Sequence, residues 1–213
     1  MMEVIKLVVN GFGENTYIVA DMTVKECAIV DPGVSDHEER DALRKAVAKY
    51  GLKPVHLINT HLHIDHVLGN AFVCEEYGLT PKAHRDDAFL GARVKEQARM
   101  FGIPLKVEDT VIGSYLEDGD EIRVGDSVLK VLAVPGHSPG SIALYCPDSH
   151  FVITGDALFA GSIGRTDLPG GDYSTLIDSI SSRLMTLPDD TVVYPGHGMP
   201  TTIGAEKRQN PYL

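Results

Sequence analysis

The distribution of apolar residues predicts β-strands at the start of the chain and again after residue 120. Three short β-type runs open the chain and are separated by glycine-rich or polar breaks. The predicted strands cover 4–9, 16–20, 27–30, 55–59, 121–124, 127–134, 141–146, 151–154 and 191–194. Gly125 and Asp126 are typical of a two-residue hairpin turn.

Apolar residues at helical spacing predict four helices between these strands. In the first, Leu43, Val47 and Tyr50 follow the capping-box sequence Ser35-Asp36-His37-Glu38, and Gly51 ends the helix. The others cover 67–77, 85–101 and 173–187. Both halves of the chain run strands, helix, strand, and no linker or repeat separates them. We expect one domain over 1–213, of class α/β (α+β), with two packed sheets and helices outside rather than a doubly wound parallel sheet.

Composition and charge limit the classes of partner that the chain is expected to bind. The 213 residues are 43% hydrophobic and 23% charged, which is typical of a globular chain. A formal net charge of −11 without a basic patch makes nucleic acid an unexpected partner. The longest apolar run has five residues, 142–146, whereas a membrane span needs roughly 20. No secretory signal is evident, so we expect a cytoplasmic protein that does not enter the membrane. Its oligomeric state is open.

The three cysteines do not point to a site of their own. Cys27, Cys74 and Cys146 are widely spaced and form no Cys-x-x-Cys pair. We therefore expect neither a disulfide framework nor a zinc ribbon, but small buried apolar side chains.

The strongest chemical signal is the segment Thr60-His61-Leu62-His63-Ile64-Asp65-His66, directly after the predicted strand 55–59. Histidines at i and i+2 of an extended or turning segment can face one ion. Asp65 and His66, beyond the bend, can face another. The spacing therefore predicts two metal ions.

Three further residues with ligand side chains follow other predicted strands. His137 and His197 each stand in Pro-Gly-His after strands 127–134 and 191–194, and Asp156 follows strand 151–154. A single Pro-Gly-His is usually only a turn, but here four strand ends carry ligand residues, and such ends can hold a rigid site. Five histidines and two aspartates suffice for three ligands on each of two ions, with one carboxylate between them and room for water. His37, His56, His84 and His150 lack this context.

The pattern resembles the metallo-β-lactamase fold hydrolases, whose signature His-x-His-x-Asp-His stands at 61–66. The later family positions correspond to His137, Asp156 and His197. The resemblance implies a four-layer αβ/βα sandwich. It also implies His61, His63 and His137 on the first metal, Asp65, His66 and His197 on the second, and Asp156 bridging. Class B β-lactamases of the commonest type are exported and carry cysteine at the position of Asp156, so antibiotic hydrolysis is not expected.

Two segments narrow the resemblance to glyoxalase II, the hydroxyacylglutathione hydrolases. Residues 155–165 resemble glyoxalase II, and residues 204–211 are similar to the ending of short bacterial glyoxalase II-like proteins. Arg165 stands where that family places a basic residue that contacts the thiol carrier; the alternative is an ion pair with Asp167 or Asp172. Only sixteen residues follow His197, so the helical glutathione-binding domain of the longer enzymes is not expected. The family's tyrosine after the last histidine is replaced by Gly198-Met199.

The expected activity is hydrolysis of a small thioester, S-2-hydroxyacylglutathione or a related acyl-thiol, by attack of a metal-bound hydroxide. Two divalent cations are expected, zinc first and iron or manganese as alternatives. Metal binding lowers the pKa of water from 15.7 to roughly 7. Asp65 and Asp156 are the expected catalytic residues and Arg165 the substrate-binding residue. The segment 99–118 is expected to overhang the site.

Other functions remain as alternatives. The main one is a persulfide dioxygenase on the same fold, which holds one Fe(II) with two histidines and one carboxylate. His61, His137 and Asp156 would supply that set. A nuclease is less expected, because the chain is acidic and carries no basic clamp or inserted domain. A non-catalytic binding module is less expected, because it has no need of two metals with open coordination positions.

Overall fold

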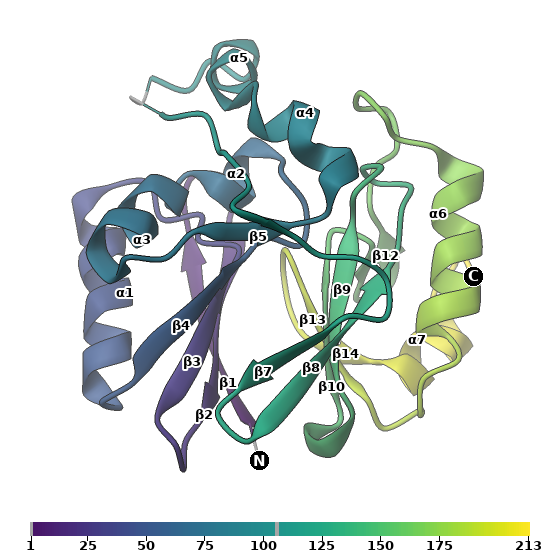
Figure 1. Ribbon diagram of the computed structural model, residues 1–213. Coiled ribbons are helices and arrows are strands. Elements are labelled where there is room, and N and C mark those ends of the chain that lie inside the picture. The colour runs from purple at the N-terminus through teal and green to yellow at the C-terminus, as the bar shows by residue number, and fades with distance from the viewer. Residues whose placement is uncertain (1, 105–106) are drawn as a thin grey trace.

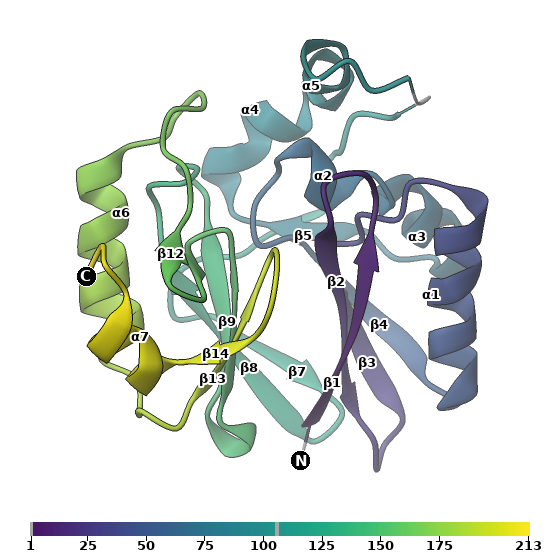
Figure 2. The same cartoon turned by 180° about the vertical axis from the view of Figure 1, so that it is seen from behind.

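Two six-stranded sheets face each other and form the centre of the molecule (Figures 1 and 2). The structure is a computed structural model and describes residues 2–104 and 107–213. The first sheet has the order β1-β2-β3-β4-β5-β6, antiparallel up to β3 and parallel beyond it. Its strands are β1 (Met2–Val9), β2 (Glu14–Asp21), β3 (Glu26–Val30), β4 (Lys53–Ile58), β5 (Pro81–Ala83) and β6 (Ser114–Tyr115).

The second sheet has the order β14-β13-β10-β9-β8-β7, and its only parallel pair among the described residues is β10 with β13. A small hairpin, β11 (Leu158–Phe159) with β12 (Ser162–Ile163), lies beside it. The strands of the sheet are β7 (Glu121–Val124), β8 (Ser127–Ala133), β9 (Ile142–Cys146), β10 (Phe151–Gly155), β13 (Val192–Pro195) and β14 (Thr201–Thr202).

Helices cover the outer faces of both sheets and one end of the molecule (Figures 1 and 2). Helices α1 (His37–Lys49) and α3 (Asn70–Tyr77) cover the first sheet. Helix α6 (Tyr173–Ser179), its π-helical continuation η3 (Ile180–Leu184) and α7 (Ile203–Gln209) cover the second. The end of the molecule carries α2 (Ile64–Val67), α4 (Ala88–Gly91) and α5 (Val94–Met100). Two 3₁₀ turns complete the elements, η1 (Arg85–Asp87) and η2 (Pro147–Ser149). The predicted αβ/βα sandwich is confirmed.

Strand residues alternate between two cores. In β2, Tyr17 and Val19 face the second sheet, whereas Ile18 and Ala20 pack against the helices, and all four are fully buried. Burying each large apolar side chain contributes about 1.5–3 kcal/mol. Because both faces of such strands are covered, their sequences are nearly continuous apolar runs. The position of the sheets is therefore strongly determined.

Three predicted helices are shorter than their apolar spacing indicates. The helix expected over 67–77 is divided into α2 and α3 at Gly69, where a Cβ would stand 2.6 Å from the Pro32 carbonyl oxygen. The helix expected over 85–101 is divided into η1, α4 and α5, and Gly91 packs against the backbone of Thr110. The helix expected over 173–187 keeps α-helical geometry only to Ser179. Long-range backbone contacts thus override local periodicity.

The start of α1 also differs from the prediction by one residue. Asp36, not Ser35, is the N-cap, and its side chain accepts a hydrogen bond from the backbone N–H of Glu39. The carboxylate of Glu39, not that of Glu38, returns to Ser35. The predicted end at Gly51, with φ of 62°, and the Gly125-Asp126 turn are confirmed. No described helix is long and apolar enough to pass through a bilayer.

Candidate metal centre

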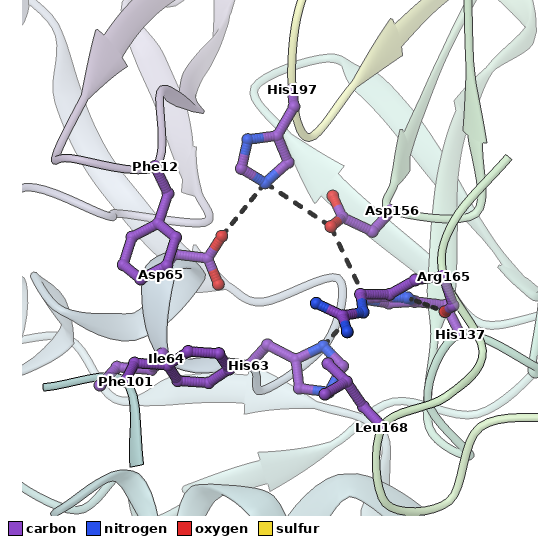
Figure 3. Close-up of a pocket in the computed structure, with 10 residues that line it drawn as sticks. All are labelled: Phe12, His63, Ile64, Asp65, Phe101, His137, Asp156, Arg165, Leu168 and His197. Carbon is purple, nitrogen blue, oxygen red and sulfur yellow. Dashed lines mark hydrogen bonds and ion pairs between the residues drawn. The ribbon is translucent and has the colours of Figure 1, made fainter. Parts of the chain in front are cut away.

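The predicted ligand residues gather at one end of the sheet pair, where strands from both sheets finish. His61 and His63 lie between β4 and α2, and Asp65 and His66 lie on α2. His137 follows β8, Asp156 follows β10 and His197 follows β13. Figure 3 shows side chains from these separate segments pointing toward one another.

Histidines from both halves of the chain form the first group. The ligand atoms of His61, His63 and His137 all lie within 4.8 Å of one another. Nδ1 of His63 is 2.8 Å from Nε2 of His137, although 74 residues separate them in the chain. The structure thus brings together the three residues expected on the first metal.

The second group combines Asp65, His66 and His197, whose ligand atoms also lie within 4.8 Å of one another. Oδ2 of Asp65 is 3.1 Å from Nε2 of His197 and 3.6 Å from Nε2 of His66. Asp156 faces both groups: Oδ1 lies 3.3 Å from Nε2 of His66, and Oδ2 lies 3.6 Å from Nε2 of His137. All seven predicted ligands therefore belong to one cluster, while their roles as ligands stay predictions.

Three of the imidazoles use Nδ1 for a contact on the side away from the cluster, which turns Nε2 of each toward it. Nδ1 of His61 contacts the Thr60 hydroxyl at 3.1 Å, and Nδ1 of His137 contacts the Arg165 carbonyl oxygen at 2.7 Å. Nδ1 of His66 contacts Asp31 at 3.2 Å. With the ring proton on Nδ1 in each case, Nε2 keeps its lone pair. Nε2 of His61, Nε2 of His66 and Oδ1 of Asp156 are buried without a hydrogen-bond partner among the described residues. This donor set fits a metal site.

Burial and neighbouring charges shift the pKa values of the site's side chains in different directions. Burial, together with the nearby His137, lowers the pKa of His63 to about 3. Burial raises the pKa of Asp156, but His66 beside it more than offsets this, so the pKa lies below its usual value. His66 likewise lowers the pKa of Asp65 against the effect of burial. Burial lowers the pKa of His66, but the carboxylates of Asp65 and Asp156 more than offset this and raise it above its usual value. Neutral imidazoles and ionised carboxylates are the forms that bind divalent cations, so a cation bound here would displace the proton of His66.

Asp31 is a member of the site that the sequence analysis missed. It follows β3 and adopts a left-handed backbone conformation with φ of 48°. It accepts hydrogen bonds from the Thr60 backbone N–H at 2.7 Å and the Thr60 hydroxyl at 2.6 Å, in addition to its contact with His66. Its ligand atoms could also join His61 and His66 in a third group. Because Thr60 and His66 already engage its oxygens, we assign it to orienting the ligands.

Asp87 supports the two loops that carry the first group. This buried carboxylate accepts hydrogen bonds from the backbone N–H of Leu62 at 3.0 Å and of Gly140 at 2.6 Å. It also accepts one from the Ser138 hydroxyl at 2.7 Å. Asp87 therefore fixes the His61–His63 segment relative to the His137 loop.

A cavity of about 200 Å³ opens onto the cluster (Figure 3). Arg165 lies at this cavity and forms a two-point ion pair with Asp167, each N···O distance being 2.7 Å. Of the two alternatives for Arg165, the ion pair with Asp167 is observed, and contact with substrate stays a prediction. From the segment 99–118, Phe101 reaches the cavity; residues 105 and 106 lie outside the described part of the chain.

Residues 9–197 match the family model of the metallo-beta-lactamase superfamily. The chain belongs to this superfamily. Among its curated relatives, hydroxyacylglutathione hydrolase GloC of Haemophilus influenzae is 38% identical over 210 residues, covering 96% of this chain and 95% of the relative. The human mitochondrial persulfide dioxygenase ETHE1 is 31% identical over 202 residues, covering 93% and 70%.

Solved structures of the superfamily are also similar. The B3 metallo-beta-lactamase BLEG-1 has a TM-score of 0.88 and 31% identity, with 99% of each chain covered. TTHA1623, solved in a di-iron-bound form, has a TM-score of 0.85 and 37% identity, with 98% of this chain and 100% of that one covered. These relatives confirm the predicted superfamily, the likeness to glyoxalase II and the assignment of the chain as an enzyme of this superfamily.

Proposed function

We propose that this chain is a hydrolase of small thioesters that uses two divalent cations. His61, His63 and His137 would hold one cation, Asp65, His66 and His197 the other, and Asp156 would bridge them. The observation that carries the proposal is the position of Asp156, whose two oxygens face histidines of both groups. A single carboxylate directed at two ligand groups is what a binuclear site requires.

The residues at the cavity favour water as the nucleophile. No Ser, Thr or Cys is among the described residues that line it. When bound, divalent cations lower the pKa of a coordinated water toward neutrality and polarise a carbonyl oxygen. Asp65 and Asp156 contact His66 and His197, which hold the two carboxylates in place. They would position the cations, and Asp65 would also orient the attacking water. Arg165 would contact the thiol carrier at the cavity edge.

The proposal also covers the substrate class, the metal and the cellular location. The relative GloC is named for hydroxyacylglutathione hydrolysis, which supports a thiol ester as the substrate class. TTHA1623 binds two irons, so iron stands beside zinc and manganese as the metal. We propose a cytoplasmic location for this enzyme and a single domain over residues 1–213.

The test measures thiol release from acyl-glutathione thioesters by protein reconstituted with zinc, iron or manganese. We expect turnover, and we expect Asp156→Asn to lower it at least 100-fold and to reduce the bound metal. Asp190→Asn is the matched control, because Asp190 is exposed and contacts only His150 among the described ion pairs. Full activity of Asp156→Asn with two metals bound would contradict the proposal. A β-lactam is included as a comparison substrate, and we expect no turnover of it.

A second candidate is the oxidation of a persulfide at one iron. It is favoured by the 31% identity to a human persulfide dioxygenase and by the subset His61, His137 and Asp156, which could form a two-histidine, one-carboxylate site. Oxygen consumption with glutathione persulfide, measured on the same preparation, separates the two functions. Oxygen uptake without thioester cleavage would contradict the proposed hydrolase activity and support persulfide dioxygenase activity.

A further inference from the structure

Two phenylalanines from distant parts of the chain meet at the mouth of the cavity. Phe12 lies in the turn between β1 and β2, and Phe101 directly follows α5. Their rings stand edge to face, with centroids 6.0 Å apart and an interplanar angle of 89°. Both line the cavity, and Figure 3 shows them on the side of Asp65. Each stays about two-fifths exposed, and adjoining exposed apolar side chains are typical of ligand-binding grooves.

The apolar surface continues beyond this pair. A smaller cavity of about 30 Å³ shares His63, Phe101 and Leu168 with the main one and is further lined by Met100 and Pro169. Gln97 also lines it, but its amide is already engaged. Gln97 accepts a hydrogen bond from the backbone of Ile64 and donates to the carbonyl oxygens of Leu62 and Leu90. Among the described residues that line this smaller cavity, His63 is therefore the one whose side chain keeps a hydrogen-bonding atom without a partner.

The opposite side of the cavity is polar. Arg165 is the one Lys or Arg among the described lining residues, and Figure 3 shows it across the cavity from Phe12 and Phe101. A thioester has two arms on either side of its carbonyl carbon. With the carbonyl at the metal ligands, one arm would lie toward Arg165 and the other toward the aromatic pair.

We propose that Phe12 and Phe101 form an acyl-side wall that selects thioesters with an apolar acyl group over their 2-hydroxyacyl counterparts. This inference rests on the thioester hydrolysis proposed above and specifies its substrate class. A hydroxyl placed against these rings would lose its hydrogen bonds to water and gain none from the wall. A methyl group of the same size would gain from leaving water, because apolar burial is favourable.

The decisive comparison uses two acyl groups of equal size on one thiol, isobutanoyl-glutathione and lactoyl-glutathione. We expect kcat/KM to be about tenfold higher for isobutanoyl-glutathione. In the series acetyl, propanoyl, butanoyl, we expect a rise of about fourfold for each methylene. Phe101→Ala is expected to abolish both preferences, and Phe101→Leu is expected to retain most of them.

The control variant is Phe89→Ala. Phe89 is exposed to a similar extent, 38%, but lines neither cavity, so its removal should leave the preferences unchanged. Phe12→Ala provides a second test should Phe101→Ala fold poorly. No turnover of any thioester would overturn the proposed function itself. Turnover with equal or higher kcat/KM for lactoyl-glutathione would contradict the acyl-side wall but not the proposed hydrolase activity. A preference that survives both alanine variants would do the same.

A binding measurement tests the wall without catalysis. The chain contains no tryptophan, so Phe101→Trp places a single fluorescent reporter at the wall. We expect the product acid isobutanoate to shift its emission at a concentration at least fivefold lower than lactate does. Equal responses to the two acids would contradict the proposal.

Discussion

The carboxylate of Asp31 determines which nitrogens of two neighbouring histidines face the site. It contacts Nδ1 of His66 directly, and it acts on Nδ1 of His61 through the Thr60 hydroxyl. Such contacts fix the ring orientation and tautomer of ligand histidines, and their loss typically weakens metal binding 10–100-fold. Both ligand groups therefore depend on a residue that is placed behind them.

At this scale we predict that Asp31→Asn lowers zinc affinity about 10–100-fold. Asparagine tolerates the left-handed conformation of this position, but its amide offers one acceptor where the carboxylate offers two. Competition with a chromogenic chelator measures the affinity, and Asp190→Asn again serves as control. Unchanged zinc affinity in Asp31→Asn would show that Asp31 does not orient the ligands.

At the residue scale, the sequence predicted which side chains gather at one place, but not the residues that surround them. His61, His63, Asp65 and His66 are predictable because they stand within six residues after an apolar strand. Asp31 was missed because its partners lie 29 and 35 residues further along the chain. The one available signal was its place directly after β3, the same position that Asp156 takes after β10.

Among the elements, helix α1 shows how a cap can connect distant segments. Oε1 of Glu39 accepts a hydrogen bond from the backbone N–H of Asn10 at 2.6 Å, and Oε2 accepts from the N–H of Ser35 at 2.7 Å. The Asn10 amide donates in turn to the backbone carbonyl of Asp65. Glu39 therefore joins α1 to the turn that carries Phe12 and to the start of α2.

We predict that Glu39→Ala lowers the free energy of unfolding by about 2 kcal/mol, because several hydrogen bonds to a charged group are lost. Glu38→Ala is the matched comparison. Glu38 is exposed, so its removal should change the free energy by less than about 0.5 kcal/mol. Urea unfolding of the two variants shows whether Glu39 or Glu38 stabilises the start of α1. A larger loss for Glu38→Ala would favour the capping box that the sequence predicts.

Element types were more predictable than element ends. The long strands of both sheets and α1 were predicted because their apolar spacing is regular over many residues. The strands β5, β6, β11, β12 and β14 and the helix α7 were not predicted; the strands have only two or three residues each and carry no periodic signal. The breaks at Gly69 and Gly91 result from contacts with residues far away in the chain, which a local pattern does not contain.

For the molecule as a whole, Asp21 connects the two sheets. Its Oδ1 accepts hydrogen bonds from the backbone N–H groups of Thr23 and Val24 in its own turn. Oδ2 accepts one from the N–H of Asp126, in the turn between β7 and β8, at 3.0 Å. These backbone hydrogen bonds, that of Val24 first, lower the pKa of Asp21 despite the opposing effect of burial.

The lowered pKa gives the sign of a pH dependence. The unfolded carboxyl titrates near pH 4, so the stabilisation is fully present above about pH 4 and is lost as the pH falls through the lower folded pKa. We predict that Asp21→Asn lowers the free energy of unfolding by about 1–2 kcal/mol at pH 7. The difference from the natural chain should shrink below pH 4. Denaturant unfolding of metal-free protein across pH measures this, and a difference that is independent of pH would contradict it.

The overall architecture could be predicted because both halves of the chain repeat strands, helix, strand, and because four strand ends carry ligand residues. What could not be predicted is how the halves approach each other. The 2.8 Å contact between His63 and His137 depends on that approach. The ring contact between Phe12 and Phe101 depends on how two distant segments of the first half meet. The apolar side of the cavity is therefore a property of the folded molecule, without a motif in the sequence.

The central claim is that this cluster holds two divalent cations. Elemental analysis of protein loaded with zinc and freed of excess metal tests it most directly, with His197→Ala measured alongside. The account predicts two ions per natural chain and about one per chain in His197→Ala. One ion per natural chain, with no loss in His197→Ala, would contradict it.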